Sequence, residues 1–147
     1  KSASKSHHFL GVNGNGMASI VNTTGNPDGH IVLRGGSKGP NFENQHIKSI
    51  SSELRDSNLP YKVMVDCSHG NSNKDFKKQS DVLKNVSTQI RNGEKNILGV
   101  MLESHLKEGN QKLIKTKDLE FGRSITDACI NIETTKDLLA ILYDSML

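Results

Sequence analysis

The sequence predicts an α/β fold in which parallel strands alternate with helices. Three short runs have the nearly continuous aliphatic character of strands that are covered on both faces, and they are His30–Arg34, Val63–His69 and Ile97–Glu103. Their polar ends recur at intervals of about 35 residues, close to the length of one β-α-β unit. The intervals between them carry helical patterns, as a parallel sheet requires.

Three helices are expected, at Glu43–Ser57, Asp75–Asn92 and Thr134–Leu147. In each range the apolar residues fall on one stripe, which can pack against the sheet. Pro60 lies beyond the first range and Gly93 follows the second, and both residue types are typical of helix ends. Packing on the sheet is a sufficient explanation for all three stripes.

A different pattern precedes these repeating units. The ranges His8–Val12 and Met17–Thr23 flank the sequence NGNG at 13–16. Asn and Gly tolerate the positive φ angles that tight hairpin turns demand, so we expect a β-hairpin here. A phosphate-binding glycine loop is the alternative, but no helical pattern follows the glycines.

The composition is lean for an independent core. The chain has 147 residues, of which 33% are hydrophobic and 4% aromatic, and it has no Trp. An average domain is about 45–50% apolar when Gly is included. Because the chain also begins at Lys1 rather than at Met, we expect it to be part of a larger domain.

Charge and cysteine content favour a cytoplasmic protein without nucleic-acid or membrane partners. The net charge of +3 is mild, and Lys and Arg are interleaved with Asp and Glu, which indicates a solvated surface. No apolar run approaches the ~20 residues that span a bilayer, and no signal peptide is visible. Cys67 and Cys129 form no CxxC pair and indicate no disulfide framework.

Each predicted strand ends in a polar residue, namely Arg34, His69 or Glu103. Polar ends cost packing free energy in buried strands unless they serve a site. The carboxyl ends of parallel strands meet at one edge of the sheet, and this is the edge where α/β proteins build their sites. We therefore expect these three side chains to converge.

His69, Glu103 and Asp127 form a possible metal-binding set. One imidazole and two carboxylates suit a divalent ion such as Mn²⁺, Fe²⁺, Co²⁺ or Zn²⁺. Each of these residues can also be explained without a metal ion. His69 can be a simple hydrogen-bonded residue, Asp127 can cap a helix beginning near Ala128, and Glu103 needs some partner at the end of an apolar strand.

The sequence Arg34-Gly35-Gly36 is a candidate anion site. An Arg at a strand end, followed by glycines whose backbone can come close to a ligand, suits a phosphate or a carboxylate. The alternative is an Arg that leaves a strand into a turn. His7 and His8 are adjacent and would point to opposite faces of a strand, so joint metal ligation by this pair is not expected.

Four motifs resemble one family. They are LRGG at Leu33–Gly36, DCSHGNSNKDFKKQ at Asp66–Gln79, GVMLESHLKEGNQ at Gly99–Gln111 and SITDACI at Ser124–Ile130. In their order and spacing across nearly the whole chain, they resemble the C-terminal part of type I 3-deoxy-D-arabino-heptulosonate 7-phosphate (DAHP) synthase.

The resemblance implies the C-terminal part of a (β/α)₈ TIM barrel. Residues 30–147 would be the last three barrel strands with their helices, and residues 1–29 a hairpin insertion and lead-in, together one incomplete catalytic domain. The implied enzyme is an aldol-type transferase that condenses phosphoenolpyruvate with erythrose 4-phosphate to DAHP and phosphate. This is the first step of the shikimate route to chorismate and the aromatic amino acids.

The resemblance also implies roles for individual residues. His69, Glu103 and Asp127 would bind the required divalent metal ion, which would act as a Lewis acid on the erythrose aldehyde. Arg34 would hold the phosphate of phosphoenolpyruvate, with His69 beside it, so that these two are the expected catalytic residues and also bind substrate. Asp127 is expected to contact substrate as well.

In this family the hairpin helps to bind an inhibitory aromatic amino acid. Phe9, Gly11 and Val21 lie where contacts to such an effector would be. The family's turn often reads like TKxG, whereas this turn reads NGNG, so the identity of the effector stays open. The full-length protein is expected to be a homo-oligomer.

Other features depart from the family pattern. Its fourth metal ligand is a Cys on the first barrel strand, which lies outside this sequence, and we interpret Cys67 as a core residue.

The isolated chain is expected to be inactive. Two alternatives stay open: a non-catalytic or regulatory half-barrel, and a synthase that joins phosphoenolpyruvate to another phosphosugar. The strings EGNQ and SITDACI argue against the second.

Overall fold

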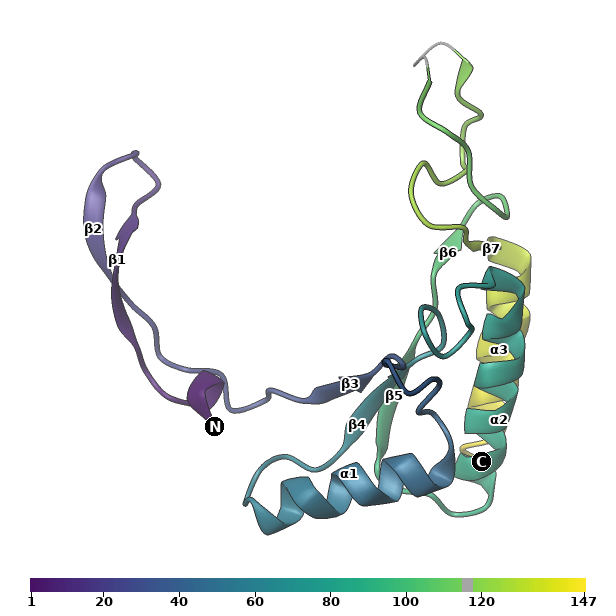
Figure 1. Cartoon of the computed structure of the whole chain (residues 1–147), viewed down its shortest axis with the longest axis horizontal. Helices are drawn as coiled ribbons and strands as arrows, with labels where there is room; N and C mark the ends of the chain where they lie inside the picture. Colours follow the sequence, from purple (N-terminus) through teal and green to yellow (C-terminus); the bar gives the residue numbers. More distant parts are fainter. Residues whose placement is uncertain (115–117) are drawn as a thin grey trace.

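The computed structural model describes residues 1–114 and 118–147 and has the expected α/β architecture (Figure 1). Its central sheet consists of β3 (Ile31–Leu33), β4 (Val63–Asp66) and β5 (Ile97–Met101). The three strands are parallel and lie in the order β3-β4-β5. The three predicted apolar runs are therefore confirmed as the strands of one parallel sheet.

The three predicted helices are also present, with small changes at their ends. They are α1 (Asn44–Asp56), α2 (Gln79–Arg91) and α3 (Ile132–Asp144), and the 3₁₀ helix η2 (Phe76–Lys78) leads into α2. Helices α2 and α3 pack against one another, and α1 lies along the sheet (Figure 1).

The core lies between the sheet and these helices. Its buried members are Leu33, Ile47, Leu54, Val63, Val65, Cys67, Val82, Leu83, Val86, Ile130 and Leu138. Full burial of one such aliphatic side chain contributes about 1.5–3 kcal/mol. The helical stripes thus have the structural role that their spacing predicts.

The helix ends follow from local chemistry. The Asn131 side chain caps α3 by accepting a hydrogen bond from the Thr134 amide at 2.8 Å. Helix α2 is followed by Gly93 with φ +93°, a conformation that glycine adopts without strain. Because α3 begins at Ile132 and is capped by Asn131, Asp127 is not the cap of a helix near Ala128.

The predicted strands are longer than the observed ones. Strands β3, β4 and β5 end at Leu33, Asp66 and Met101, so the polar residues lie in the segments just after them. For β4 the reason is local, because His69 has φ +49°, which no strand allows. Arg34, His69 and Glu103 nevertheless lie close together at one edge of the sheet, although they follow the strands.

Strand β5 does not keep the simple alternation of a regular strand, in which Ile97 and Gly99 would share a face. The register pairs Ile97 with Val63 and Gly99 with Met64. Val63 and Met64 are consecutive and point to opposite faces. Leu98 is therefore an additional residue that reverses the alternation along β5.

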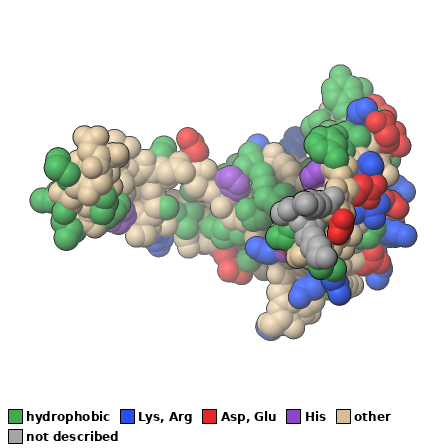
Figure 2. Space-filling view, turned by 90° about the horizontal axis from the view of Figure 1, so that it is seen from above, with side chains coloured by type: hydrophobic (Ala, Val, Ile, Leu, Met, Phe, Trp, Pro, Cys, Tyr) green, Lys and Arg blue, Asp and Glu red, His purple; other side chains and the backbone are tan. Residues whose placement is uncertain are grey.

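The N-terminal hairpin is confirmed as β1 (His8–Val12) and β2 (Ala18–Asn22), which pair antiparallel. The turn at 13–16 contains Gly16 with φ +77°, and no helix follows it, so the glycine-loop alternative is wrong. Figures 1 and 2 show that the hairpin projects away from the sheet as a separate lobe. The short 3₁₀ helix η1 (Ser2–Ser4) lies at its base. Several apolar side chains are exposed on this lobe, namely Phe9, Leu10, Val12, Met17 and Ile20.

A second projection was not predicted. Strands β6 (Ser104–His105) and β7 (Ile130–Asn131) pair in parallel, and the described residues between them, 106–114 and 118–129, extend away from the sheet (Figure 1). They include Ser124–Cys129 of SITDACI, whose last residue, Ile130, begins β7. Pairing of β6 with β7 joins the segment after β5 to the start of α3.

Both cysteines are free thiols, as expected. Cys67 is buried in the core. Its burial, and to a smaller extent the charge of Asp66, raise the pKa of its thiol to about 12. None of the helices that the structure describes is long and apolar enough to cross a membrane.

Candidate functional site

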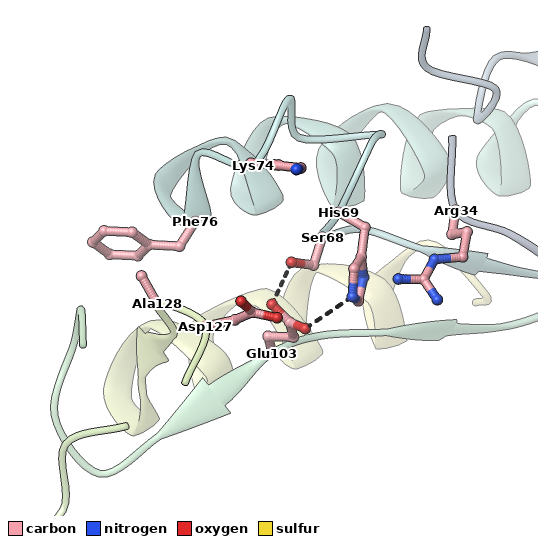
Figure 3. A pocket seen from close by; sticks show the side chains of 8 residues that line it. All are labelled: Arg34, Ser68, His69, Lys74, Phe76, Glu103, Asp127 and Ala128. Carbon is pink, nitrogen blue, oxygen red and sulfur yellow. Dashed lines mark hydrogen bonds and ion pairs between the residues drawn. The ribbon is translucent and has the colours of Figure 1, made fainter. Parts of the chain in front are cut away.

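A cavity of about 380 Å³ opens at the C-terminal edge of the sheet (Figure 3). It is lined by Arg34, Ser68, His69, Lys74, Phe76, Glu103, Asp127 and Ala128. The structure therefore brings together all four residues that the sequence suggested for chemistry. Three of them follow strands of the sheet, and Asp127 comes from the loop before β7.

The donor atoms of His69, Glu103 and Asp127 all lie within 4.8 Å of one another. This is close enough for small side-chain rotations to place all three on one ion. His69 and Glu103 are partly buried, with side-chain exposures of 28% and 23%, and Asp127 is exposed. The set thus has one side against the protein and one side open to a ligand.

The hydrogen bonds of His69 provide a direct test of whether a cation fits. Nδ1 of His69 lies 2.8 Å from Oδ2 of the buried Asp66. A carboxylate only accepts, so Nδ1 donates, and a neutral imidazole has no second N–H. In the neutral ring Nε2 presents a lone pair to Oε1 of Glu103 at 3.3 Å. A metal ion near both atoms would satisfy them, as would a second ring proton, so the donor set fits a metal ion.

Glu103 is held from two directions. Ser68 donates its hydroxyl hydrogen to Oε2 of Glu103 at 2.6 Å. The fully buried Gln79 accepts from the Glu103 amide at 2.8 Å and donates to its carbonyl at 3.2 Å. The carbonyl also accepts from the Ile130 amide at 3.0 Å. Both the backbone and the carboxylate of Glu103 are thus fixed by neighbouring elements.

Close packing of two glycines places Arg34 beside His69. The Gly70 amide donates to the Arg34 carbonyl at 3.0 Å. A Cβ on Gly35, which has φ +78°, would lie 2.5 Å from the carbonyl carbon of Gly70. Gly35 is therefore explained by contact with the protein backbone, whereas a Cβ on Gly36 would meet nothing within 4 Å.

Arg34 is exposed and extends toward His69 in the cavity (Figure 3). Among the described residues it forms no ion pair. A guanidinium group that is held at a cavity mouth without a carboxylate partner suits an anionic ligand, because it can form two parallel hydrogen bonds to a phosphate or a carboxylate.

Sequence reasoning missed residues that line this cavity or support it. Ser68 lines it and Asp66 contacts His69 from behind, yet both were interpreted only as part of a strand. Lys74 adds a second cation to the cavity lining. It has φ +61°, and its amide donates to the His69 carbonyl at 2.8 Å. A lysine in this sparsely populated conformation is a sign of a functional turn, but only a structure reveals it.

The residues suggested for an effector lie on the β1–β2 hairpin, which projects away from the central sheet (Figure 1). Phe9 is the register partner of Val21. A Cβ on Gly11 would lie 2.9 Å from a methyl carbon of Val21 and 3.5 Å from the Phe9 ring. The absent side chain of Gly11 thus allows Val21 to pack closely against the backbone of β1.

His7 and His8 do not form a joint site. His7 contacts the Ser2 carbonyl through Nε2 at 2.8 Å, whereas the His8 ring contacts the Asn22 side chain. Each ring therefore has its own partner, as the alternation of a strand predicts.

Comparisons with known proteins agree on one family. Residues 1–140 match the DAHP synthetase I family. The chain is 51% identical over 140 residues to the Phe-sensitive phospho-2-dehydro-3-deoxyheptonate aldolase of Escherichia coli K12, covering 95% of this chain and 40% of that protein. It is 46% identical over 144 residues to the tyrosine-inhibited enzyme of Schizosaccharomyces pombe, covering 95% and 39%.

A solved structure of phospho-2-dehydro-3-deoxyheptonate aldolase from Francisella tularensis SCHU S4 superposes with a TM-score of 0.93 at 43% identity. The match covers 99% of this chain and 42% of that one. The chain thus spans about two-fifths of the length of these three proteins.

Proposed function

The chain belongs to the DAHP synthetase I family, and from this premise we propose that it forms the C-terminal part of the catalytic barrel of a DAHP synthase. Residues 30–147 would supply the last three β-α units of a (β/α)₈ barrel, and residues 1–29 the inserted hairpin. The parallel order β3-β4-β5, with helices between the strands, supports this proposal.

The proposed reaction joins phosphoenolpyruvate to erythrose 4-phosphate. The methylene carbon of phosphoenolpyruvate bonds to the aldehyde carbon, whose C=O double bond opens so that its oxygen becomes a hydroxyl with one proton from water. The hydroxide part of this water adds to the enol carbon, and the bond from that carbon to the phosphate oxygen breaks. The enol carbon becomes a ketone, and the second proton leaves with the phosphate. The products are DAHP and inorganic phosphate. The observation that carries the proposal is the convergence of Arg34, His69, Glu103 and Asp127 on one cavity.

His69, Glu103 and Asp127 would hold a divalent ion from the set Mn²⁺, Fe²⁺, Co²⁺ and Zn²⁺. When bound, the ion supplies Lewis-acid polarisation of the aldehyde oxygen. The preference among these ions is not part of the proposal, since the same nitrogen and oxygen donors accept all four.

The remaining groups bind and orient the substrates. Arg34 would hold the phosphate of phosphoenolpyruvate through charge-assisted hydrogen bonds and stabilise its charge as it leaves. Lys74 lines the same cavity and would add a second positive charge. His69 and Asp127 would border the reacting carbons and so restrict how the two substrates approach each other.

The hairpin is proposed to bind an aromatic amino acid through Phe9, Gly11 and Val21. The cluster of these residues and the names of the relatives, one Phe-sensitive and one tyrosine-inhibited, support this. A cytoplasmic location and a homo-oligomeric state of the full-length protein are further parts of the proposal.

The test is formation of DAHP and release of phosphate by the full-length protein with both substrates and added metal. We expect turnover that EDTA abolishes and a divalent ion restores. Absence of turnover with every one of the four ions would favour the non-catalytic half-barrel. Turnover with another phosphosugar, and none with erythrose 4-phosphate, would favour the related synthase.

A further inference from the structure

We propose that Asp66 is a positioning residue that fixes the tautomer and orientation of His69, so that Nε2 is always the nitrogen free to bind a metal ion. The inference rests on the proposed metal site but concerns a residue outside the ligand set. Asp66 does not line the cavity and acts only through His69.

Asp66 is itself held rigidly. Its side chain is 2% exposed, and its Oδ1 accepts a hydrogen bond from the Ser68 amide at 2.9 Å. The buried Asn71 donates from Nδ2 to the Asp66 carbonyl at 2.8 Å and to the Leu33 carbonyl at 2.9 Å. The carboxylate that faces His69 is thus fixed by the end of β4 and by the turn that follows it.

The alternative tautomer of His69 is disfavoured by this arrangement. It would place an unprotonated Nδ1 2.8 Å from Oδ2 of Asp66, so two acceptors would face each other in a buried place. A buried carboxylate oxygen without a donor carries the desolvation penalty of an unsatisfied charged group. With Nδ1 committed as a donor, the Nε2 lone pair is directed toward Glu103 and Asp127.

The contact also affects the strength of the ligand. A histidine that donates its other ring N–H to a carboxylate is a more basic ligand with a fixed ring orientation, and loss of such a partner typically weakens metal binding about 10–100-fold. Asp66 therefore contributes to metal affinity without contacting the ion.

The first measurement is the location of the His69 proton in the metal-free, full-length protein. Two-dimensional ¹⁵N–¹H NMR of the protein labelled with ¹⁵N-histidine distinguishes the two ring nitrogens, at a pH where His69 carries one proton. We expect the proton on Nδ1. A proton on Nε2 would overturn the proposal, and this measurement needs neither a variant nor catalysis.

The second measurement is Mn²⁺ affinity of Asp66→Asn. The amide can donate to Nδ1 and so favours the Nε2–H tautomer, and we expect affinity to fall 10–100-fold. Asp81→Asn is the matched control, because Asp81 is exposed on α2 and its replacement removes the same charge. Unchanged affinity in Asp66→Asn, or an equal loss in the control, would contradict the proposal.

A double variant separates positioning from general damage to the fold. If Asp66 acts through His69, the Asp66→Asn change should weaken Mn²⁺ binding far less when His69 is already Gln. Equal losses in both backgrounds would show that Asp66 does not act through His69. If circular dichroism shows that Asp66→Asn does not fold, the NMR measurement of the His69 tautomer in the unaltered protein tests the proposal by itself. Absence of DAHP formation alongside the expected tautomer would reject only the proposed function.

Discussion

Gly35 and Gly70 touch backbone to backbone, and this contact joins the segment after β3 to the segment after β4. A side chain on Gly35 would lie 2.5 Å from the carbonyl carbon of Gly70. The two segments carry Arg34 and His69, so the spacing of a cation and a ligand in the cavity depends on a place where no Cβ fits. Gly35 is therefore required by this close contact, whereas Gly36 is not.

Gly35→Ala should destabilise the protein, whereas Gly36→Ala should not. The first change puts a Cβ into the Gly70 backbone at a position with φ +78°, and the conformation alone costs about 1–2 kcal/mol. The second change meets open space and should stay within about 0.5 kcal/mol. Urea unfolding measures both. Equal stability of the two variants would contradict the packing argument.

Much of the scaffold is predictable from the sequence because it depends on local pattern. The stripes around Ile47 and Val82 and the turn at 13–16 specify their elements through spacing and turn chemistry alone. The face of Gly99 is not predictable, because Leu98 adds a residue to β5 that only the pairing with β4 reveals. Pairing of β6 with β7 depends on two residues in each strand, too few for a pattern.

The sequence suggested the four residues Arg34, His69, Glu103 and Asp127 that meet at the cavity, but not the groups that hold them in place. His69 and Glu103 follow apolar runs, and parallel strands bring such ends together. Asp66, Ser68 and Gln79 hold these two residues through individual hydrogen bonds, and no periodicity encodes a single hydrogen bond. Their contribution requires the three-dimensional turn after β4.

Replacement of Arg34 should reduce catalysis strongly in the full-length protein. Loss of one charge-assisted contact costs about 1.5–3 kcal/mol, equivalent to roughly a 10–100-fold fall in kcat/KM for phosphoenolpyruvate. Arg34→Lys should recover only part of the loss seen in Arg34→Gln, because an ammonium group cannot form the two parallel bonds. Steady-state kinetics measure both variants.

Arg91→Gln is the control for charge alone, since Arg91 is an exposed residue at the end of α2. It should leave kcat/KM unchanged. Full activity in Arg34→Gln would remove Arg34 from substrate binding.

Glu103→Gln should abolish tight metal binding while the fold is retained. The amide is nearly isosteric and can still accept from the Ser68 hydroxyl, but it replaces an anionic donor of the set with a neutral one. Isothermal titration with Mn²⁺ should show at least a tenfold loss, which corresponds to about 1.4 kcal/mol. Glu108→Gln, at an exposed position in the next segment, should bind as the unaltered protein does. The opposite order of affinities would exclude Glu103 as a ligand.

Substitutions on the hairpin should change inhibition and spare turnover. Gly11→Leu forces a side chain against Val21 and the Phe9 ring, and Phe9→Ala removes one of these apolar groups. If this cluster binds an aromatic amino acid, both variants should require more phenylalanine or tyrosine for half-maximal inhibition at unchanged kcat. A parallel loss of inhibition and kcat would instead show that the hairpin is structural.

The isolated chain of residues 1–147 should not form DAHP. Strand β4 is paired on both sides, but β3 and β5 each have one unpaired edge within the described sheet. Open edges of this kind promote association with other chains. In the proposed barrel further strands would pair with these edges, and in this chain the side chains Val32, Leu98 and Met101 are 36%, 52% and 40% exposed. A complete barrel fills its interior with layers drawn from alternate strands, which three strands cannot supply.

The cavity of the isolated chain also lacks binding groups for two phosphorylated substrates. Arg34 and Lys74 are the only cations that the described residues contribute to its lining, and each further charge-assisted contact that is missing costs about 1.5–3 kcal/mol. We expect no DAHP from the purified 147-residue chain with metal and both substrates. Activity should appear when the remaining barrel strands are supplied, either in one polypeptide or by co-expression. Turnover by the chain alone would mean that three strands suffice to build the site.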